Sequence, residues 1–139
     1  MNILVDTSIW YLALRRRAEA LSPSEKALVG ELAELVREGR ASILGIVRQE
    51  VLSGIKTLEQ YEKLRGTLRA FPDQPLTISD YEAAAKASNT CRSKGVAVPV
   101  VDALICAVGA TFDWPIFTTD PDFKSYATLL PIKLHSFRR

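Results

Sequence analysis

Short apolar runs that resemble strands alternate along this chain with segments of helical periodicity, and this alternation limits the fold more than any other feature. Parallel strands need crossover connections, and the helices that supply them cover both faces of the sheet. We therefore expect an α/β fold with a parallel sheet, in which the first run is a central strand. The strand-like runs lie at residues 2–5, 41–46, 76–78, 116–118 and 132–134.

The helices are predicted from apolar side chains at helical spacing and from capping residues at their starts. Ser22 and Glu25 have the spacing of a capping box, with a proline between them, and they open a helix that Gly39 ends. Ser79 and Glu82 repeat this spacing ahead of an alanine-rich helix that runs to residue 95. Further helices are expected at residues 9–14, 47–55, 57–71 and 99–109.

Length and composition are those of an ordinary globular protein. The 139 residues fit one domain, which we assign to residues 1–139, and the net charge of +2 is too small to indicate a nucleic-acid binder. Cys91 and Cys106 lack the spacing of a zinc or redox motif, so we expect reduced, buried thiols. The sequence has neither a membrane-spanning apolar segment nor a signal peptide, which predicts a cytoplasmic protein without a membrane partner.

Acidic residues stand just after the strand-like runs or early in the helices that follow them. The carboxyl ends of parallel strands meet at one edge of a sheet, where α/β proteins bind ligands, so we expect these side chains to converge. Clustered carboxylates repel one another unless they are partly protonated or bind a cation, and a hard divalent metal ion is the usual solution. The set comprises Asp6, Glu50, Asp102 and Asp120.

Each acid also has a purely structural explanation. Asp6 can cap the helix that follows it, and Glu50 and Asp102 can compensate helix dipoles. Asp120 and Asp122 can form a turn around the proline between them. Apolar neighbours nevertheless place Glu50 and Asp102 close to buried surface, where an unpaired carboxylate is costly.

Other chemistries find little support in the sequence. The single histidine, His135, excludes a multi-histidine zinc site, and we expect it to be a surface or packed strand residue. The chain has no P-loop, no Rossmann glycine fingerprint and no serine in a nucleophile-elbow setting. The segment after the first strand also lacks the acids of an aspartyl phosphatase or a receiver domain.

Four segments resemble the motifs of PIN-domain ribonucleases, in the order and spacing of the VapC toxins of toxin–antitoxin pairs. The resemblance covers essentially the whole chain, and the combination is specific although each motif alone is weak. It implies a PIN-like three-layer α/β/α sandwich with a central parallel sheet. The segments are Leu4-Val5-Asp6-Thr7-Ser8, Arg48 to Gly54, Gly95 to Ala107, and Phe117 to Phe123.

The resemblance also implies a function and a site. The expected activity is that of an endoribonuclease dependent on Mg²⁺ or Mn²⁺, in which the metal activates a water for attack on a phosphodiester. The implied partners are an RNA substrate, a second copy of the chain in a homodimer, and a VapB-like antitoxin whose carboxyl-terminal segment lies across the toxin. The implied catalytic and metal-binding acids are Asp6, Glu50, Asp102 and Asp120, with Asp122 as a fifth metal ligand and Thr7 and Thr119 as hydroxyls that orient carboxylates or water.

Contacts to macromolecules are predicted from charge and apolar spacing. The RNA phosphates are expected to meet Arg15, Arg16, Arg17, Arg48 and Lys94, although exposed basic residues are as often only solvated. The antitoxin is expected to contact Trp10, Tyr11 and Leu14, of which Trp10 or Tyr11 should be partly exposed. Two alternatives remain open: a PIN nuclease of RNA maturation or decay without an antitoxin, and a non-catalytic RNA- or partner-binding PIN module.

Overall fold

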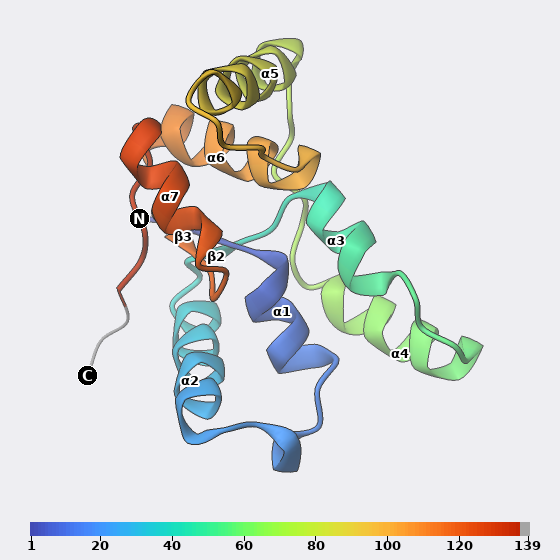
Figure 1. Ribbon diagram of the computed structural model, residues 1–139. Helices are drawn as coiled ribbons and strands as arrows, with labels where there is room; N and C mark the ends of the chain where they lie inside the picture. Colours follow the sequence, from blue (N-terminus) through green and yellow to red (C-terminus); the bar gives the residue numbers. More distant parts are fainter. Residues whose placement is uncertain (137–139) are drawn as a thin grey trace.

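The computed structural model describes residues 1–136, and its centre is a parallel sheet. The remaining residues of the predicted domain, 137–139, lie outside the described residues. Strand β1 (Ile3–Val5) lies between β2 (Ala41–Ser42) and β3 (Ile116–Phe117), and it is parallel to both (Figure 1). The first apolar run is therefore the central strand, as the sequence predicts.

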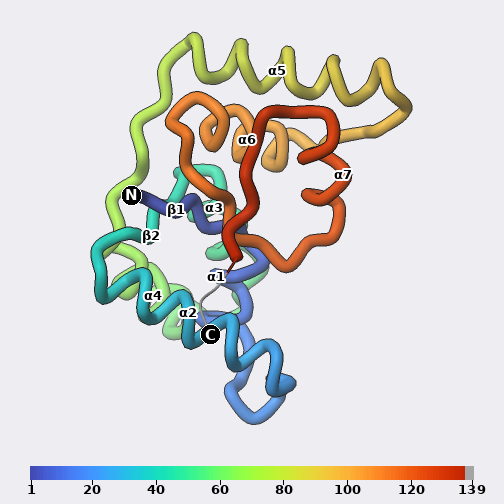
Figure 2. Tube along the Cα trace, turned by 90° about the vertical axis from the view of Figure 1, so that its left-hand side faces the viewer, coloured from blue at the N-terminus to red at the C-terminus, as the bar shows by residue number. Residues whose placement is uncertain are grey.

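Helices cover both faces of this sheet and give the predicted three-layer α/β/α arrangement. Figures 1 and 2 agree in placing α5 over α6 on one side of the strands and α1, α2 and α4 on the other. Among residues 1–136, none of the helices has the length and apolar character needed to cross a membrane. The bounds are α1 (Thr7–Leu14), the short 3₁₀ helix η1 (Ala18–Ala20), α2 (Pro23–Arg37), α3 (Gly45–Leu52), α4 (Leu58–Leu68), α5 (Ile78–Ser93), α6 (Val100–Phe112) and α7 (Asp122–Leu129).

The core lies where α6 meets the strands. All three residues of β1 are fully buried, and so is most of the middle of α6. Gly109 lets α6 approach β3 closely, because a Cβ atom at this position would lie 3.0 Å from the side chain of Ile116. Cys91 and Cys106 are buried free thiols, as predicted, and burial raises the pKa of both, that of Cys106 to about 12. Both thiols therefore stay protonated and inert.

The predicted helix starts are confirmed for α2 and α4, but the start predicted for α5 is wrong. Ser22 and Glu25 form the expected capping box. At α5 the box is made instead by Thr77 and Asp80: the Asp80 carboxylate accepts the Thr77 N–H at 2.8 Å, and the Thr77 hydroxyl accepts the Asp80 N–H. Thr77 therefore stands at the helix boundary, and the strand predicted at residues 76–78 does not form.

The carboxyl-terminal part of the fold also differs from the prediction. The strand expected at residues 132–134 is reduced to a single parallel bridge between Leu134 and Ile116. Helix α7, which the sequence analysis does not predict, follows directly after Asp120. Its signal is hidden because its start resembles a turn, while its buried face consists of Phe123 and Tyr126 at a spacing of three residues.

Candidate active site

Asp6 stands where β1 ends and is almost completely buried. Its backbone N–H donates to the carbonyl of Phe117, which ties the end of β1 to the end of β3. One carboxylate oxygen, Oδ2, accepts hydrogen bonds from the hydroxyls of Ser8 at 2.8 Å and Thr118 at 2.7 Å. Among the described residues the side chain makes no capping bond to α1, so helix capping does not explain this aspartate.

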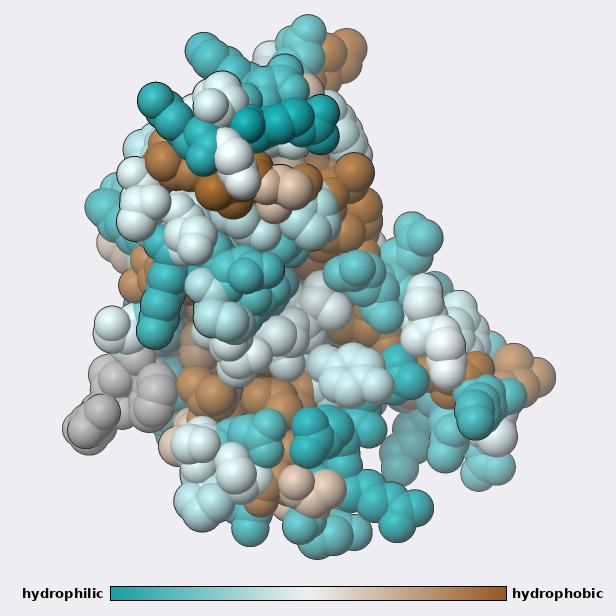
Figure 3. Space-filling view, in the orientation of Figure 1, coloured by the Kyte–Doolittle hydropathy of each residue, from teal (hydrophilic) through white to brown (hydrophobic). Residues whose placement is uncertain are grey.

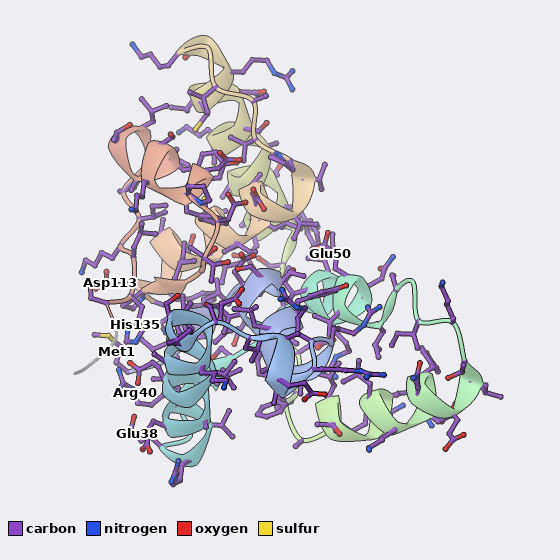
Figure 4. The ribbon with its side chains drawn as sticks, turned by 60° about the horizontal axis from the view of Figure 1, so that its bottom comes forward. Met1, Glu38, Arg40, Glu50, Asp113 and His135 are labelled. Atoms are coloured by element: carbon purple, nitrogen blue, oxygen red, sulfur yellow. The ribbon has the colours of Figure 1, made fainter. Side chains whose placement is uncertain are left out.

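Glu50 reaches the same region from α3 and is exposed, contrary to the expectation that it lies near buried surface (Figure 4). Its Oε1 accepts a hydrogen bond of 2.7 Å from the hydroxyl of Thr7, the first residue of α1. The contact joins α1 to α3 beside Asp6. Thr7 thus meets one of the acids, as the resemblance implies.

Asp102 lies in the first turn of α6, and its Oδ2 accepts a hydrogen bond of 3.0 Å from the hydroxyl of Tyr126 on α7. Burial raises the pKa of Asp102 from its usual value of 3.8 to about 6, against the lowering effect of this hydrogen bond. The negative charges of Asp6, Asp120 and Glu50 add to the increase. The charges of Asp6, Glu50 and Asp120 therefore all act on Asp102, and we call the region between these four acids the cleft.

Asp120 lies between β3 and α7, two residues before the helix begins. Its backbone N–H donates to the Thr118 hydroxyl at 3.0 Å, and its Oδ1 accepts the N–H of Asp122 at 2.9 Å. The turn chemistry expected around the proline is therefore present, yet Asp120 also lies close enough to Asp102 to raise its pKa. Asp122 is exposed at the margin of the cleft. Burial and the neighbouring Asp102 raise the pKa of Tyr126, and the charges of Asp122 and Asp120 add to the rise.

The donor chemistry of the cleft suits a hard divalent cation, because its charged groups are carboxylates that repel one another. Burial is the main cause of the raised pKa of Asp102, and repulsion by Asp6, Asp120 and Glu50 adds to it. Within residues 1–136, no three side chains of histidine, cysteine, aspartate or glutamate already form a set that could hold a metal ion. The residues fit a cation by charge and donor type, but the described side chains are not preassembled around one.

Comparison with known proteins identifies the family. A family model described as PIN domain matches residues 3–129. The chain belongs to the PIN domain family. A search of curated proteins gives no match.

Solved structures of low sequence identity share the fold of this PIN domain. A structure of FitAcB from Neisseria gonorrhoeae has a TM-score of 0.74 at 16% identity and covers 96% of both chains. A structure of VapBC2 from Rickettsia felis, bound to a DNA fragment from its promoter, has a TM-score of 0.72 at 17% identity and covers 99% of this chain and 100% of that one. VapBC-5 from Mycobacterium tuberculosis, a member of the VapBC family of toxin–antitoxin systems, has a TM-score of 0.65 at 18% identity, with 96% of each chain covered.

Three side chains that the sequence analysis does not single out contact the acids of the PIN domain. Ser8 and Thr118 donate to Asp6, and Tyr126 donates to Asp102. Thr119, which the resemblance points to, contributes its backbone N–H to the Ser8 hydroxyl, while its own side chain is exposed. Ser8 and Thr118 lie within the motif segments and could have been proposed from the sequence. Tyr126 could not, because its helix is not predicted.

Two of the predicted RNA-binding arginines are held by the PIN domain itself. Arg48 donates to the carboxylate of Asp73 at 2.7 Å and to the carbonyls of Leu68 and Phe71. The Arg15 guanidinium donates to the carbonyl of Val51 in the last turn of α3, at 3.0 Å, and to that of Ser53 just after it, at 2.9 Å. Both guanidinium groups are therefore engaged in hydrogen bonds that hold elements of the fold together.

The other basic candidates lie at the surface. Arg16 donates to the carbonyl of Ala20 and lies 3.8 Å from the Glu25 carboxylate, while Arg17 and Lys94 are exposed.

His135 is packed: its Nε2 lies 2.8 Å from an oxygen of Glu31 on α2 (Figure 4). The packed alternative expected for this histidine is therefore the one found.

The predicted antitoxin contacts divide between core and surface. Trp10 is 1% exposed, donates its indole N–H to the carbonyl of Val5 and packs against Phe71, so its prediction as a surface contact is wrong. It is buried because it belongs to the face of α1 that covers the sheet. Tyr11 is 41% exposed, with the Arg15 guanidinium over its ring. Leu14 lines a groove of about 530 Å³ between α1 and α4.

Proposed function

We propose that this PIN domain is a metal-dependent endoribonuclease and the toxin of a type II, VapBC-like pair, with residues 1–139 forming one nuclease domain. PIN-domain nucleases are hydrolases that act on nucleic acids. The observation that carries the proposal is the convergence of carboxylates from four separate segments: Asp6, Asp120 and Glu50 lie close enough to Asp102 to add to the rise in its pKa that burial causes. A carboxylate with a perturbed pKa among other carboxylates is typical of a functional site.

PIN domains generally use divalent metal ions, and here Mg²⁺ or Mn²⁺ would be held by the carboxylates of the cleft. When bound, the ion would activate a water and neutralise charge on the phosphodiester. The hydroxyls of Thr7, Ser8 and Thr118 orient carboxylates, and Thr119 is proposed to orient the attacking water. The proposed ligands are Asp6, Glu50, Asp102 and Asp120, with Asp122 at the margin.

The RNA substrate is proposed to meet exposed basic residues rather than the arginines that the fold uses. Arg17 and Lys94 remain the candidates for phosphate contacts, with Arg16 next to Arg17 in sequence but close to Glu25. Arg15 and Arg48 are not proposed to contact RNA, because their guanidinium groups already donate to the protein's own carbonyls.

A VapB-like antitoxin is proposed to occupy the groove between α1 and α4. Leu14, Ile55 and Leu64 supply apolar lining, and Lys56 and Lys63 add positive charge. Figure 3 shows the corresponding notch at the lower right, between the ends of α1 and α4. An apolar helix with acidic residues along its edge fits this lining.

The groove proposal is tested by the substitution Leu14→Glu. We expect it to weaken binding of the cognate antitoxin at least tenfold in a titration, while RNA cleavage by the free protein persists. Unchanged affinity would place the interface elsewhere.

A homodimer is supported by an apolar patch on α5 and α6, defined by Ile78, Tyr81 and Val100. These side chains are 80%, 56% and 74% exposed, and Tyr81 and Val100 border a hollow of about 400 Å³ lined by uncharged residues. Figure 3 shows brown surface at the upper right, where α6 begins. A twofold axis brings such a patch against its own copy without like-charge repulsion. Since Val100 precedes Asp102 by two residues, the two clefts would lie near each other.

The catalytic proposal is tested with total RNA and the purified chain. We expect cleavage in the presence of Mn²⁺, loss of cleavage in EDTA, and recovery when Mn²⁺ or Mg²⁺ is added in excess. Cleavage that continues in EDTA does not depend on a metal ion, and it would argue against the proposal. Cleavage without any antitoxin binding would favour a nuclease of RNA maturation or decay.

A further inference from the structure

We propose that Tyr126 is a positioning residue that fixes the orientation of the Asp102 carboxylate, an inference that rests on the proposed function. The hydroxyl of Tyr126 donates to Asp102 Oδ2 at 3.0 Å, and the tyrosine is 1% exposed. Its ring packs edge-on against Phe123, with 5.1 Å between the ring centres. The Tyr126 hydroxyl is therefore held in place by packing of its ring in the core.

The packing of Tyr126 makes its hydroxyl a fixed reference point. Tyrosine has two side-chain torsions, and burial of the ring leaves little freedom for either. Asp102 faces repulsion from Asp6, Asp120 and Glu50, which favours rotation of its carboxylate away from the cleft. A hydrogen bond to Oδ2 opposes this rotation and leaves Oδ1 available to a ligand.

The same arrangement recurs at the neighbouring acids. Asp6 accepts hydroxyl hydrogen bonds from Ser8 and Thr118, and Glu50 accepts one from Thr7, at 2.7–2.8 Å. Each of these acids is thus held by a hydroxyl group from a different residue of the cleft. Tyr126 supplies the equivalent contact for Asp102.

Helix α7 connects this contact to a second acid. The Asp120 carboxylate accepts a backbone N–H at the start of α7, and Tyr126 lies one turn further along the same helix. Helix α7 therefore helps to fix where the Asp120 carboxylate lies relative to the Asp102 carboxylate. Removing the Tyr126 hydroxyl leaves the helix in place and breaks the connection at one atom.

The alternative is that Tyr126 is only a core residue whose buried hydroxyl needs an acceptor. Tyr126→Phe separates the two, because it keeps the ring and removes the oxygen. Tyr61→Phe is the matched control, since it deletes the same atom on α4. Binding of Mn²⁺ by calorimetry and steady-state cleavage of an RNA oligonucleotide are the two measurements.

For Tyr126→Phe we expect Mn²⁺ affinity and kcat each to fall about tenfold, as is typical when a partner of a metal ligand is lost, with KM for RNA within about twofold of the wild type. Tyr61→Phe should match the wild type. Wild-type Mn²⁺ affinity and kcat in a folded Tyr126→Phe variant would overturn the inference, as would a variant that does not fold, since the hydroxyl would then be structural. A wild-type protein that binds no Mn²⁺ would overturn the proposed function itself, so the two failures are distinguishable.

Discussion

Asp6 and Asp102 share one cleft but have different surroundings. Asp6 is buried and accepts two hydroxyl hydrogen bonds at one oxygen, whereas Asp102 is half-buried and accepts one. Burial and three neighbouring carboxylates raise the pKa of Asp102 to about 6. Without a bound metal ion, the ionised Asp102 carboxylate therefore destabilises the fold near neutral pH.

The pH dependence of stability follows from this pKa. Because the folded value of about 6 exceeds the usual value of 3.8, the stability that protonated Asp102 contributes is fully present below about pH 3.8 and is lost as the pH rises through about 6. In EDTA, Asp102→Asn should therefore have a higher melting temperature than the wild type at pH 7, and the gain should shrink towards pH 4. Thermal melts across this range measure it. A gain that does not depend on pH, or a loss at pH 7, would contradict the assignment.

Single residues show where sequence reasoning succeeds and where it stops. The acids were identified because their positions follow from strand ends, which depend on local patterns. Their exposure and partners depend on tertiary packing, so Glu50 is unexpectedly exposed and Tyr126 was not found. Either Trp10 or Tyr11 was expected to be partly exposed; Tyr11 is, whereas Trp10 lies in the core, and helix periodicity alone does not distinguish the two.

Among the elements, helices with strong caps were predictable, whereas the ends of short strands were not. The capping box of α2 is formed by the predicted residues. At α5 two overlapping capping patterns compete, and the one that begins at Thr77 forms because Asp80 can reach back to its N–H. Helix α7 was missed because Pro121 between two aspartates resembles a turn. Strands of two or three residues contain too little pattern to define their ends.

The start of α5 gives a test at the level of one element. Thr77→Ala removes the side chain that accepts the Asp80 N–H, and it should lower the free energy of unfolding by about 1 kcal/mol. Ser79→Ala, in the exposed first turn, should change it by less than about 0.5 kcal/mol. Urea denaturation of both variants measures the difference. Equal effects, or a larger effect at Ser79, would restore the helix start that the sequence alone suggested.

At the scale of the whole molecule, the order of strands and helices explains how distant residues meet. The acids come from positions 6, 50, 102 and 120, and the parallel sheet with its crossover helices brings them to one edge. The alternation of elements was sufficient to predict this convergence. It could not predict the apolar patch on α5 and α6, because which face of a helix remains uncovered depends on the complete packing.

The apolar patch predicts the state of the molecule in solution. Light scattering at micromolar concentration should give a mass about twice the 15.4 kDa of the chain. Tyr81→Glu or Val100→Glu places a charge in the patch next to its own copy and should give the monomer mass. Leu58→Glu is the matched control, since Leu58 is 75% exposed on α4 and lies outside the patch. A wild-type monomer, or dimers that persist in both patch variants, would count against this interface.

The central claim is that carboxylates from separate segments act together in metal-dependent cleavage of RNA. The most direct measurement is the rate of RNA cleavage at saturating Mn²⁺ for Asp6→Asn and Asp120→Asn, beside the control Asp113→Asn. Asp113 is an exposed aspartate outside the cleft, in the left-handed conformation that asparagine also tolerates. We expect each cleft variant to lose more than about a hundredfold in rate while remaining folded, and the control to retain wild-type activity. Cleavage at the wild-type rate by folded Asp6→Asn and Asp120→Asn proteins would contradict the claim.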